Sequence, residues 1–392
     1  MKFQCSKADI LPHIQQAQSI VGQKTTLHIL SNLHLQTKDN RLIFSATDLE
    51  IGIRSSCIVE VSEHGSTTVP ARKFFDIIRN LTDQPIQIEV TDNVTKIQCG
   101  RSFYRVFGLP ASDFPELPDF SEAPVWEFGQ KLLKNMILHT SFAISRDESR
   151  YVLNGIYMVF NPHEIVGVAT DGRRLSMSTH SVSSYGGSTP APSVGDVSTQ
   201  EAGRIGEGET NFKDMKVDFI VPSKTVNELT KILSDEGNVK VFYKANQVCF
   251  EMGATTLITK LIEGNFPDFS SVIPKSSSEK VLFNHKDFSA TIARVAILAS
   301  EKTNSIKFAF MPGKCVITAN SPNVGDAREE LEVQYEGKEF AIAFNPFYLL
   351  DILKCVKTEI VTLELSNALS PGVVRQESEF LSVIMPMRLT AD

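Results

Sequence analysis

The stretch TTVPARKFFDIIRNL, residues 67 to 81, places a short run with strand character directly before an amphipathic helix. Two further stretches have the same form: FIVPSKTVNELTKIL, residues 219 to 233, and AFNPFYLLDILKCVK, residues 343 to 357. In each, the run ends at a proline step, and proline is tolerated at the start of a helix. A pattern that occurs three times predicts an architecture of repeats.

Each of these helices is preceded along the chain by another amphipathic helix, with apolar residues spaced three and four apart. The three earlier helices are predicted over residues 7 to 21, 130 to 144 and 286 to 299. The separations test the repeat: 61 residues from Asp9 to Pro70, 59 from Asp287 to Pro346, and 92 from Gln130 to Pro222. Two copies therefore agree, and the middle copy is longer.

The extra length coincides with residues 181 to 211, SVSSYGGSTPAPSVGDVSTQEAGRIGEGETN, which are rich in Ser, Gly, Pro and Thr. This composition indicates a flexible insertion in the second copy. Without it, each repeat is predicted as β-α-β-β-β-α-β-β-β, an antiparallel sheet with both helices on one face. The fold class is α+β, with three domains expected over residues 1–125, 126–278 and 279–392.

Composition is that of an ordinary globular protein, with 42% hydrophobic and 22% charged residues in 392. No signal peptide and no apolar run long enough to cross a membrane is found, which predicts a cytoplasmic protein. The six cysteines stand singly, without metal-site spacing, and are expected to be buried reduced thiols.

Charge is distributed unevenly. The chain has a net charge of −7, but its six helical segments contain twelve Lys and Arg against five Asp and Glu. If the helices share one face, that face is basic and attracts polyanions without reading base sequence. Few aromatic residues accompany these cations, which favours duplex backbone over single-strand contact. Simple solvation of an outer face explains the charge equally well.

Motifs for catalysis are absent: the sequence has no HExxH, GxSxG or GxxxxGK[ST]. GRIGEG, residues 203 to 208, lies inside the polar insertion, where a chance occurrence is favoured. Asp147 and Glu148 could hold a metal, but flanking arginines favour a charged helix end. His163 and His285 are isolated. The two alternatives left open are a cytoplasmic peptide-binding scaffold without a DNA role and an enzyme with an unrecognised site.

Several segments resemble one family, the bacterial DNA polymerase III beta subunits, or sliding clamps. They are TTVPARKFFDIIRNL, GLPASDFPELPDF, RYVLNGIY, VATDGRRL, GNFPDFSSVIP, RVAILASEKTNSIKF and the terminal VIMPMRL. The resemblance covers nearly the whole chain. It implies a non-catalytic processivity factor without a cofactor, a head-to-tail homodimer of six domains closed into a ring around double-stranded DNA. The partners it implies are the replicative polymerase, the clamp loader and other proteins with a clamp-binding motif.

The resemblance also implies site residues. Matching positions for a partner-peptide pocket are Leu153, Thr170, Gly172, Arg173, Arg174, Leu175, Pro267, Val272, Ile292, Asn345, Tyr348, Val383, Ile384, Met385, Pro386, Met387 and Arg388. Methionines suit a pocket for varied peptides because their side chains repack easily. DNA contacts are expected at Lys24, Arg72, Arg150, Tyr151 and Lys224, and the dimer interface at Tyr104, Val106 and Phe288.

The sequence departs from the family pattern in the insertion, in Thr390, Ala391 and Asp392 after Leu389, and at two pocket positions. Ser271 stands where an arginine is frequent, and Ile292 where an aromatic residue is common. Peptide preference is therefore expected to differ from that of other members. Val383 is expected to be a core residue of the last strand, whereas Met385 and Met387 are expected to line the pocket.

Overall fold

The computed structural model describes residues 1–22, 27–120, 123, 125–161, 164–181, 216–300, 303–322 and 324–388. Its contacts divide the chain into two compact units. Unit 1 contains the described residues of Met1–Lys134 and Lys224–Leu261, and unit 2 those of Asn135–Ser184, Asp214–Ser223 and Ile262–Asp392. The described helices include none that is both long and apolar enough to span a membrane.

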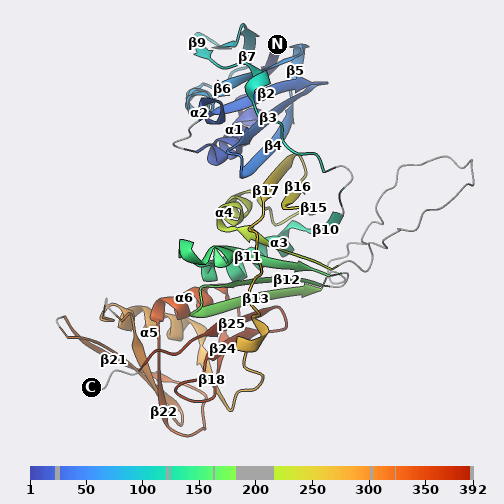
Figure 1. Ribbon diagram of the computed structural model, residues 1–392. Coiled ribbons are helices and arrows are strands. Elements are labelled where there is room, and N and C mark those ends of the chain that lie inside the picture. Colours follow the sequence, from blue (N-terminus) through green and yellow to red (C-terminus); the bar gives the residue numbers. More distant parts are fainter. Residues whose placement is uncertain are drawn as a thin grey trace, which may run out of the picture. The chain divides into compact units, whose positions relative to one another are not determined.

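All six predicted helices are present: α1 (Lys7–Ile20), α2 (Ala71–Asn80), α3 (Gln130–Thr140), α4 (Ser223–Ile232), α5 (His285–Ala296) and α6 (Pro346–Cys355) (Figure 1). Side chains cap several N-termini. Ser6 accepts from the backbone N–H of Asp9, and Asn345 accepts from that of Phe347, with Pro346 in the first turn of α6. These caps satisfy backbone donors that have no partner within the helix.

Unit 1 contains two antiparallel sheets, in the orders β5-β1-β7-β8-β9 and β10-β15-β16-β17-β4-β3-β2-β6. Their strands are β1 (Lys2–Cys5), β2 (Asn32–Lys38), β3 (Arg41–Thr47), β4 (Ile51–Ile58), β5 (Glu60–Glu63), β6 (Gly65–Pro70), β7 (Ile86–Thr91), β8 (Val94–Cys99), β9 (Ser102–Phe107), β10 (Val125–Gly129), β15 (Asn238–Lys244), β16 (Gln247–Met252) and β17 (Thr255–Lys260). The second sheet joins strands of the first repeat to strands of the second through β4 and β17.

Unit 2 repeats this plan, with sheets in the orders β14-β11-β12-β13-β25-β24-β23-β18 and β21-β20-β19-β22. The strands are β11 (Gly155–Phe160), β12 (Glu164–Thr170), β13 (Arg174–Ser181), β14 (Val217–Pro222), β18 (Glu279–Asn284), β19 (Ile306–Met311), β20 (Lys314–Ser321), β21 (Gly325–Glu332), β22 (Phe340–Phe344), β23 (Ile360–Leu365), β24 (Gly372–Gln376) and β25 (Phe380–Ile384). Here β13 and β25 join the second repeat to the third.

The predicted order of elements needs one correction. The third repeat runs β18, α5, β19, β20, β21, β22, α6, β23, β24, β25, so four strands rather than three separate its helices. The strand predicted directly before the second helix is present, at FAIAF in β22 and at VDFIVP in β14, so only the total number of strands was too low. These runs pair fully with β19 and β11, which makes them strands of the sheet and not linkers.

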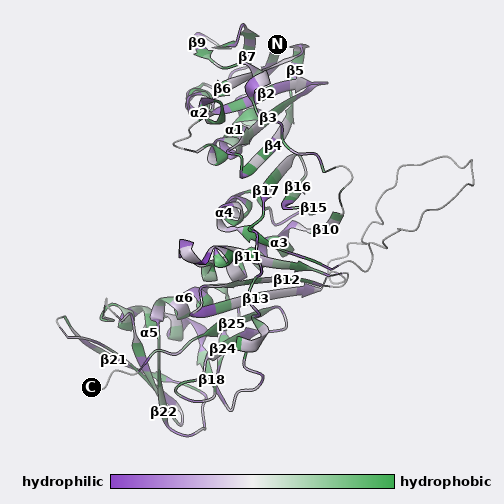
Figure 2. Cartoon of the chain, in the orientation of Figure 1, coloured by the Kyte–Doolittle hydropathy of each residue, from purple (hydrophilic) through white to green (hydrophobic). Residues whose placement is uncertain are grey.

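Apolar residues alternate with polar residues along many strands, as the hydropathy colouring in Figure 2 shows. The third repeat has an aromatic core in which Phe283, Phe288, Phe308, Phe310 and Phe344 are all 1% exposed or less. Such large buried rings dominate the stability of a core. The six cysteines are free thiols, as predicted, and those at positions 5, 99, 249 and 315 are buried.

Candidate functional site

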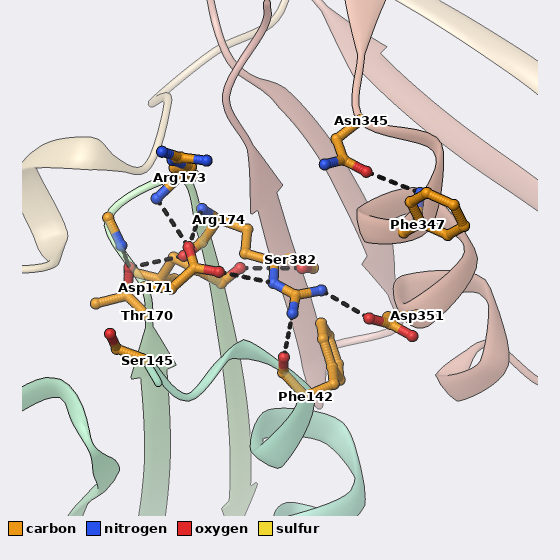
Figure 3. A network of polar contacts seen from close by, with 12 residues as sticks. Phe142, Ser145, Thr170, Asp171, Arg173, Arg174, Asn345, Phe347, Asp351 and Ser382 are labelled. Carbon is orange, nitrogen blue, oxygen red and sulfur yellow. Dashed lines mark hydrogen bonds and ion pairs between the residues drawn. The ribbon is translucent and has the colours of Figure 1, made fainter. Parts of the chain in front are cut away.

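The polar network around Arg174 is the structural centre of the predicted peptide site (Figure 3). The guanidinium donates to Asp171 at 3.1 Å, to Asp351 at 2.9 Å and to the carbonyl of Phe142. It also stacks over the ring of Tyr348, 4.3 Å from the centroid. The side chain is 10% exposed. A planar guanidinium can make these in-plane hydrogen bonds and the ring contact together, which an ammonium group cannot.

Asp351, on α6, joins this network to the helix. Burial raises the pKa of its carboxyl group, but hydrogen bonds from Arg174 and Lys354 outweigh that effect and leave the pKa below its usual value. Lys354 donates to Asp351 at 2.9 Å. The carboxylate therefore stays ionised at neutral pH and ties β13 of the second repeat to α6 of the third.

The C-terminal segment lies beside this network. Arg174 is paired with Ile384 across β13 and β25, and the backbone N–H of Met385 donates to the carbonyl of Arg173 at 2.9 Å. Further along, the N–H of Met387 donates to the carbonyl of Ala343 at 2.8 Å. Met385 is 43% exposed, whereas Ile384 is fully buried. The chain thus leaves the core between these two neighbouring residues.

The opposite face of the same strands is covered by residues 266 to 273. Phe266, Phe269 and Ile273 pack against a small apolar cluster that includes Leu175 and Val383. Within this segment, Val272 remains 46% exposed. Pro267 is exposed as well. The predicted residues therefore come from both faces of the sheet that contains β12, β13 and β25.

We call this region the β13–β25 rim: the turn at residues 171 to 173, Arg174, Tyr348 and the segment Met385–Arg388, of which Met385 and Arg388 are exposed. Gly172 in the turn has φ of +83°, a conformation that favours glycine. Thr170 stabilises the turn by accepting from the N–H of Gly172 at 3.1 Å. Asn345 holds the start of α6 next to the Met387 contact.

Not every predicted pocket residue offers a surface. Ile292 is 0% exposed and belongs to the same apolar core as Phe288. The expectation that the Ile292 side chain contacts a peptide directly is therefore wrong. This side chain packs the buried face of α5 against the core. Leu153, Leu175, Val383 and Ile384 are also buried, at 8% exposure or less. The expectation that Val383 belongs to the core is confirmed.

The predicted DNA contacts differ in how available their charges are. Arg72 is exposed on α2 and forms no hydrogen bond or ion pair with the described residues. Lys224 is paired with Asp48, and Arg150 lies 3.6 Å from Asp147. Tyr151 is 58% exposed. Lys24 and the insertion at 182–211 lie outside the described residues, as does His163.

The predicted dimer contacts need a second correction. Phe288 is 0% exposed and stacks on Phe283 at 3.8 Å between centroids, so its side chain cannot meet another chain. Val106 is also buried, at 9%. Tyr104 is 38% exposed, and its neighbours Phe103 and Phe107 are 56% and 69% exposed. On β9 only Val106 is buried and the other five residues are exposed, as is expected for a strand at the edge of its sheet.

Asp147 behaves as the charged helix end that was favoured over a metal ligand. It is the N-cap of the 3₁₀ helix Glu148–Leu153, where it accepts from the N–H of Ser149 at 3.0 Å. No group of three or more metal-ligating side chains occurs among the described residues. Sequence reasoning missed Asp171 and Asp351. The Asp-Gly turn in VATDGRR pointed to the first, but nothing local pointed to the second.

The comparisons with known proteins agree with this geometry. Family models of the N-terminal, C-terminal and central domains of the DNA polymerase III beta subunit match residues 1–118, 270–388, and 127–211 with 202–268. The chain is 35% identical to the beta sliding clamp of Chlamydia pneumoniae over 100% of both chains. It is 33% identical to that of Escherichia coli K12, over 99% of this chain and 100% of the relative.

A solved structure of the DNA polymerase III subunit beta from Pseudomonas aeruginosa is 31% identical, with a TM-score of 0.88 over 99% of this chain and 100% of the other. The DNA polymerase sliding clamp from Bacillus subtilis is 28% identical, with a TM-score of 0.88 over the full length of both. The likeness spans all three repeats. The chain belongs to the DNA polymerase III beta subunit family, the bacterial sliding clamps.

Proposed function

We propose that two copies of this chain close head to tail into a ring around duplex DNA and tether the replicative polymerase through the β13–β25 rim. The protein is a processivity factor and not a catalyst, and it acts in the cytoplasm, where bacterial DNA is replicated. The observation that carries the proposal is the rule by which successive repeats join.

That rule is visible twice within the chain. At the first junction β4 of the first repeat pairs antiparallel with β17 of the second, and at the next β13 of the second pairs antiparallel with β25 of the third. In both cases the strand that lies third after the first helix of one repeat meets the last strand of the following repeat. Two strands of these types have no such partner: β21 of the third repeat and β9 of the first, each at an edge of its sheet.

Unpaired edges invite pairing with another chain. A third junction of the same kind would therefore join β21 of one copy to β9 of the next, and a heterologous series of this sort must either close or polymerise. The edges are complementary in charge: β21 contains Asp326, Glu329, Glu330 and Glu332 with one arginine, whereas β9 contains Arg105. Ile297, just past α5, is 78% exposed and offers an apolar contact that Phe288 cannot.

DNA binding is proposed to rest on helix cations that the protein leaves without partners. Arg72 and Lys73 on α2, Lys131 on α3 and Lys286 on α5 are exposed and form no hydrogen bond or ion pair with described residues. Cations of this kind bind phosphates regardless of base sequence. A ring holds DNA by topology, so weak contacts suffice. Paired cations such as Lys224 would first have to leave their carboxylates.

Partner binding is proposed at the β13–β25 rim. Met385, Pro386 and Met387 are exposed or half-buried, and their backbone is bonded to Arg173 and Ala343. Val272 is exposed in the segment that covers the other face of the strands. Exposed apolar groups next to a rigid polar network suit a short peptide that contributes its own apolar anchors. Ser271 is exposed in place of a cation, so this rim is expected to favour acidic peptides less than family members with arginine there.

The decisive experiment combines mass and topology. In solution the chain is expected to have the mass of a dimer, and after loading by a clamp loader it should be retained on nicked circular DNA and lost when that DNA is linearised. Equal retention on circular and linear DNA would contradict a ring. A variant with Phe107→Asp, which places a carboxylate on the β9 edge, serves as the matched control and should fail to be retained on either form.

A further inference from the structure

Unit 1 contains a polar cleft that neither the peptide site nor the helix cations use. It has a volume of about 640 Å³ and lies between β2, β3 and β4 on one side and residues 111 to 117 on the other. Pockets for small organic ligands fall in the same range, about 300 to 1,000 Å³. We propose that this cleft binds a small phosphorylated organic molecule of nucleotide size.

The floor of the cleft is a row of side chains set by strand register. His34 on β2 lies opposite Ser45 on β3, which lies opposite Arg54 on β4. Side chains two residues apart share a face, so Gln36 and Lys38 continue the same surface. This is not the helix-covered face, because Phe44, the neighbour of Ser45, stacks on His13 of α1 at 5.6 Å between ring centroids. The cleft is therefore separate from the proposed DNA contacts.

The donors that line the cleft are unused. Arg54, Lys38 and Gln36 are exposed, and their side chains form no hydrogen bond or ion pair with the described residues. His34 contributes a ring that stacks on Phe114 at 5.2 Å, but its nitrogens have no hydrogen-bond partner in the described chain. Guanidinium, ammonium and imidazole groups that converge in this way match the several acceptor oxygens of a phosphate.

The far wall of the cleft is apolar and suits the organic part of the ligand. Pro115 and Leu117 line the cleft together with Ile43. A Cβ added at Gly52, two residues before Arg54 on β4, would lie 2.6 Å from Leu117. The glycine thus lets the loop approach the strand and bring an apolar wall close to Arg54. A phosphate alone would leave this wall unoccupied, whereas a sugar or base attached to it would cover the wall.

Charge in the cleft supports the choice of an anion. Lys38 and Arg54 face one carboxylate, Glu116, among the lining residues. Burial lowers the pKa of His34, and the nearby charge of Arg54 lowers it further, so the imidazole is neutral at pH 7 without ligand. A bound phosphate would oppose the effect of Arg54 and raise the pKa of His34. Binding should then be accompanied by uptake of a proton by the His34 imidazole.

The test measures binding of AMP, inorganic pyrophosphate and adenosine to the full chain without DNA, by calorimetry and by NMR of the His34 ring. AMP is expected to bind saturably and to raise the pKa of His34, pyrophosphate to bind more weakly, and adenosine not to bind. Arg54→Gln and Lys38→Gln should each weaken AMP binding about tenfold, as expected for loss of a charged hydrogen bond. Glu116→Gln should strengthen it.

The matched control is Lys2→Gln, which removes an exposed lysine of the same unit on β1, outside the cleft. It should leave AMP binding unchanged, and His34→Gln should remove the part of the proton uptake that comes from the imidazole. No saturable AMP binding at millimolar concentration, or equal affinities of the wild type and Arg54→Gln, would overturn the proposal. If pyrophosphate bound as tightly as AMP, the inference that the cleft also recognises the organic part of the ligand would be overturned. Retention on circular DNA is a separate readout that none of these outcomes decides.

Discussion

Removal of residues 385 to 392 separates a partner-binding role for the C-terminus from a structural one. The truncation leaves β25, with Val383 and Ile384, intact. Among described contacts it deletes the backbone hydrogen bonds from Met385 to Arg173 and from Met387 to Ala343. At about 0.5 to 1.5 kcal/mol each, these bonds contribute about 1 to 3 kcal/mol. Two methionines in a closed core would instead cost about 2 to 5 kcal/mol each on truncation to alanine.

The assay is chemical unfolding together with fluorescence binding of a short peptide with a glutamine followed by apolar and aromatic residues. We expect the unfolding free energy to fall by about 1 to 3 kcal/mol while peptide affinity falls at least tenfold, because interface energy concentrates in a few apolar anchors. The double variant Met385→Ala/Met387→Ala keeps both backbone bonds and should lose affinity with a smaller loss of stability. Unchanged peptide binding by the truncated chain would refute the assignment of the rim, whatever happens to stability.

Three further outcomes are expected. Arg174→Met should lower the unfolding free energy by about 2 to 4 kcal/mol because it leaves the half-buried Asp351 without its main partner. Lys354→Met, on the exposed side of that carboxylate, should lower it by less than about 1 kcal/mol. Equal losses of unfolding free energy in urea titrations would contradict the central place of Arg174 in the polar network. Burial, with His180 and Lys357 nearby, lowers the pKa of His139 to about 4. The unfolded state therefore takes up a proton first, so stability should decline as pH falls from about 6.5 towards 4, by on the order of 2 kcal/mol, and His139→Gln should flatten this slope in thermal melts. Phe107→Asp should give a monomer by analytical ultracentrifugation, with an unchanged thermal unfolding curve. A dimer that persists in this variant would contradict the proposed β9–β21 pairing.

The helices and the threefold repeat could be predicted from local pattern. The signals for the helices are the apolar spacing, the proline step before each second helix and the capping Asn345. They act within a few residues, so they can be recognised in the sequence alone. The number of strands between the helices was predicted one too low, although the runs before the second helices, VDFIVP and FAIAF, were predicted to have strand character. Only their pairing with β11 and β19 identifies them as members of a sheet.

The candidate site was predictable in part. Resemblance placed Arg174, Tyr348 and Met385 together, and the structure brings them to one rim. The resemblance did not distinguish the exposed Met385 from the buried Ile292. The burial of Ile292 depends on which face of α5 packs against the aromatic core. The polar cleft gave a faint signal in the alternation of His34, Gln36 and Lys38, but the loop that closes it comes from residues about 80 positions further on.

By itself, then, the sequence determined the repeat, its six helices, the concentration of positive charge on them and the family. Tertiary structure alone decided that the three repeats form two compact units, because the joins at β4–β17 and β13–β25 run through continuous sheets. It also decided that β9 and β21 lie at edges of their sheets. The physical reason is that helix formation and capping are local, whereas the pairing of β4 with β17, the pairing of β13 with β25 and the contact of Arg174 with Asp351 join residues more than a hundred positions apart. Such residues become neighbours only in the folded chain.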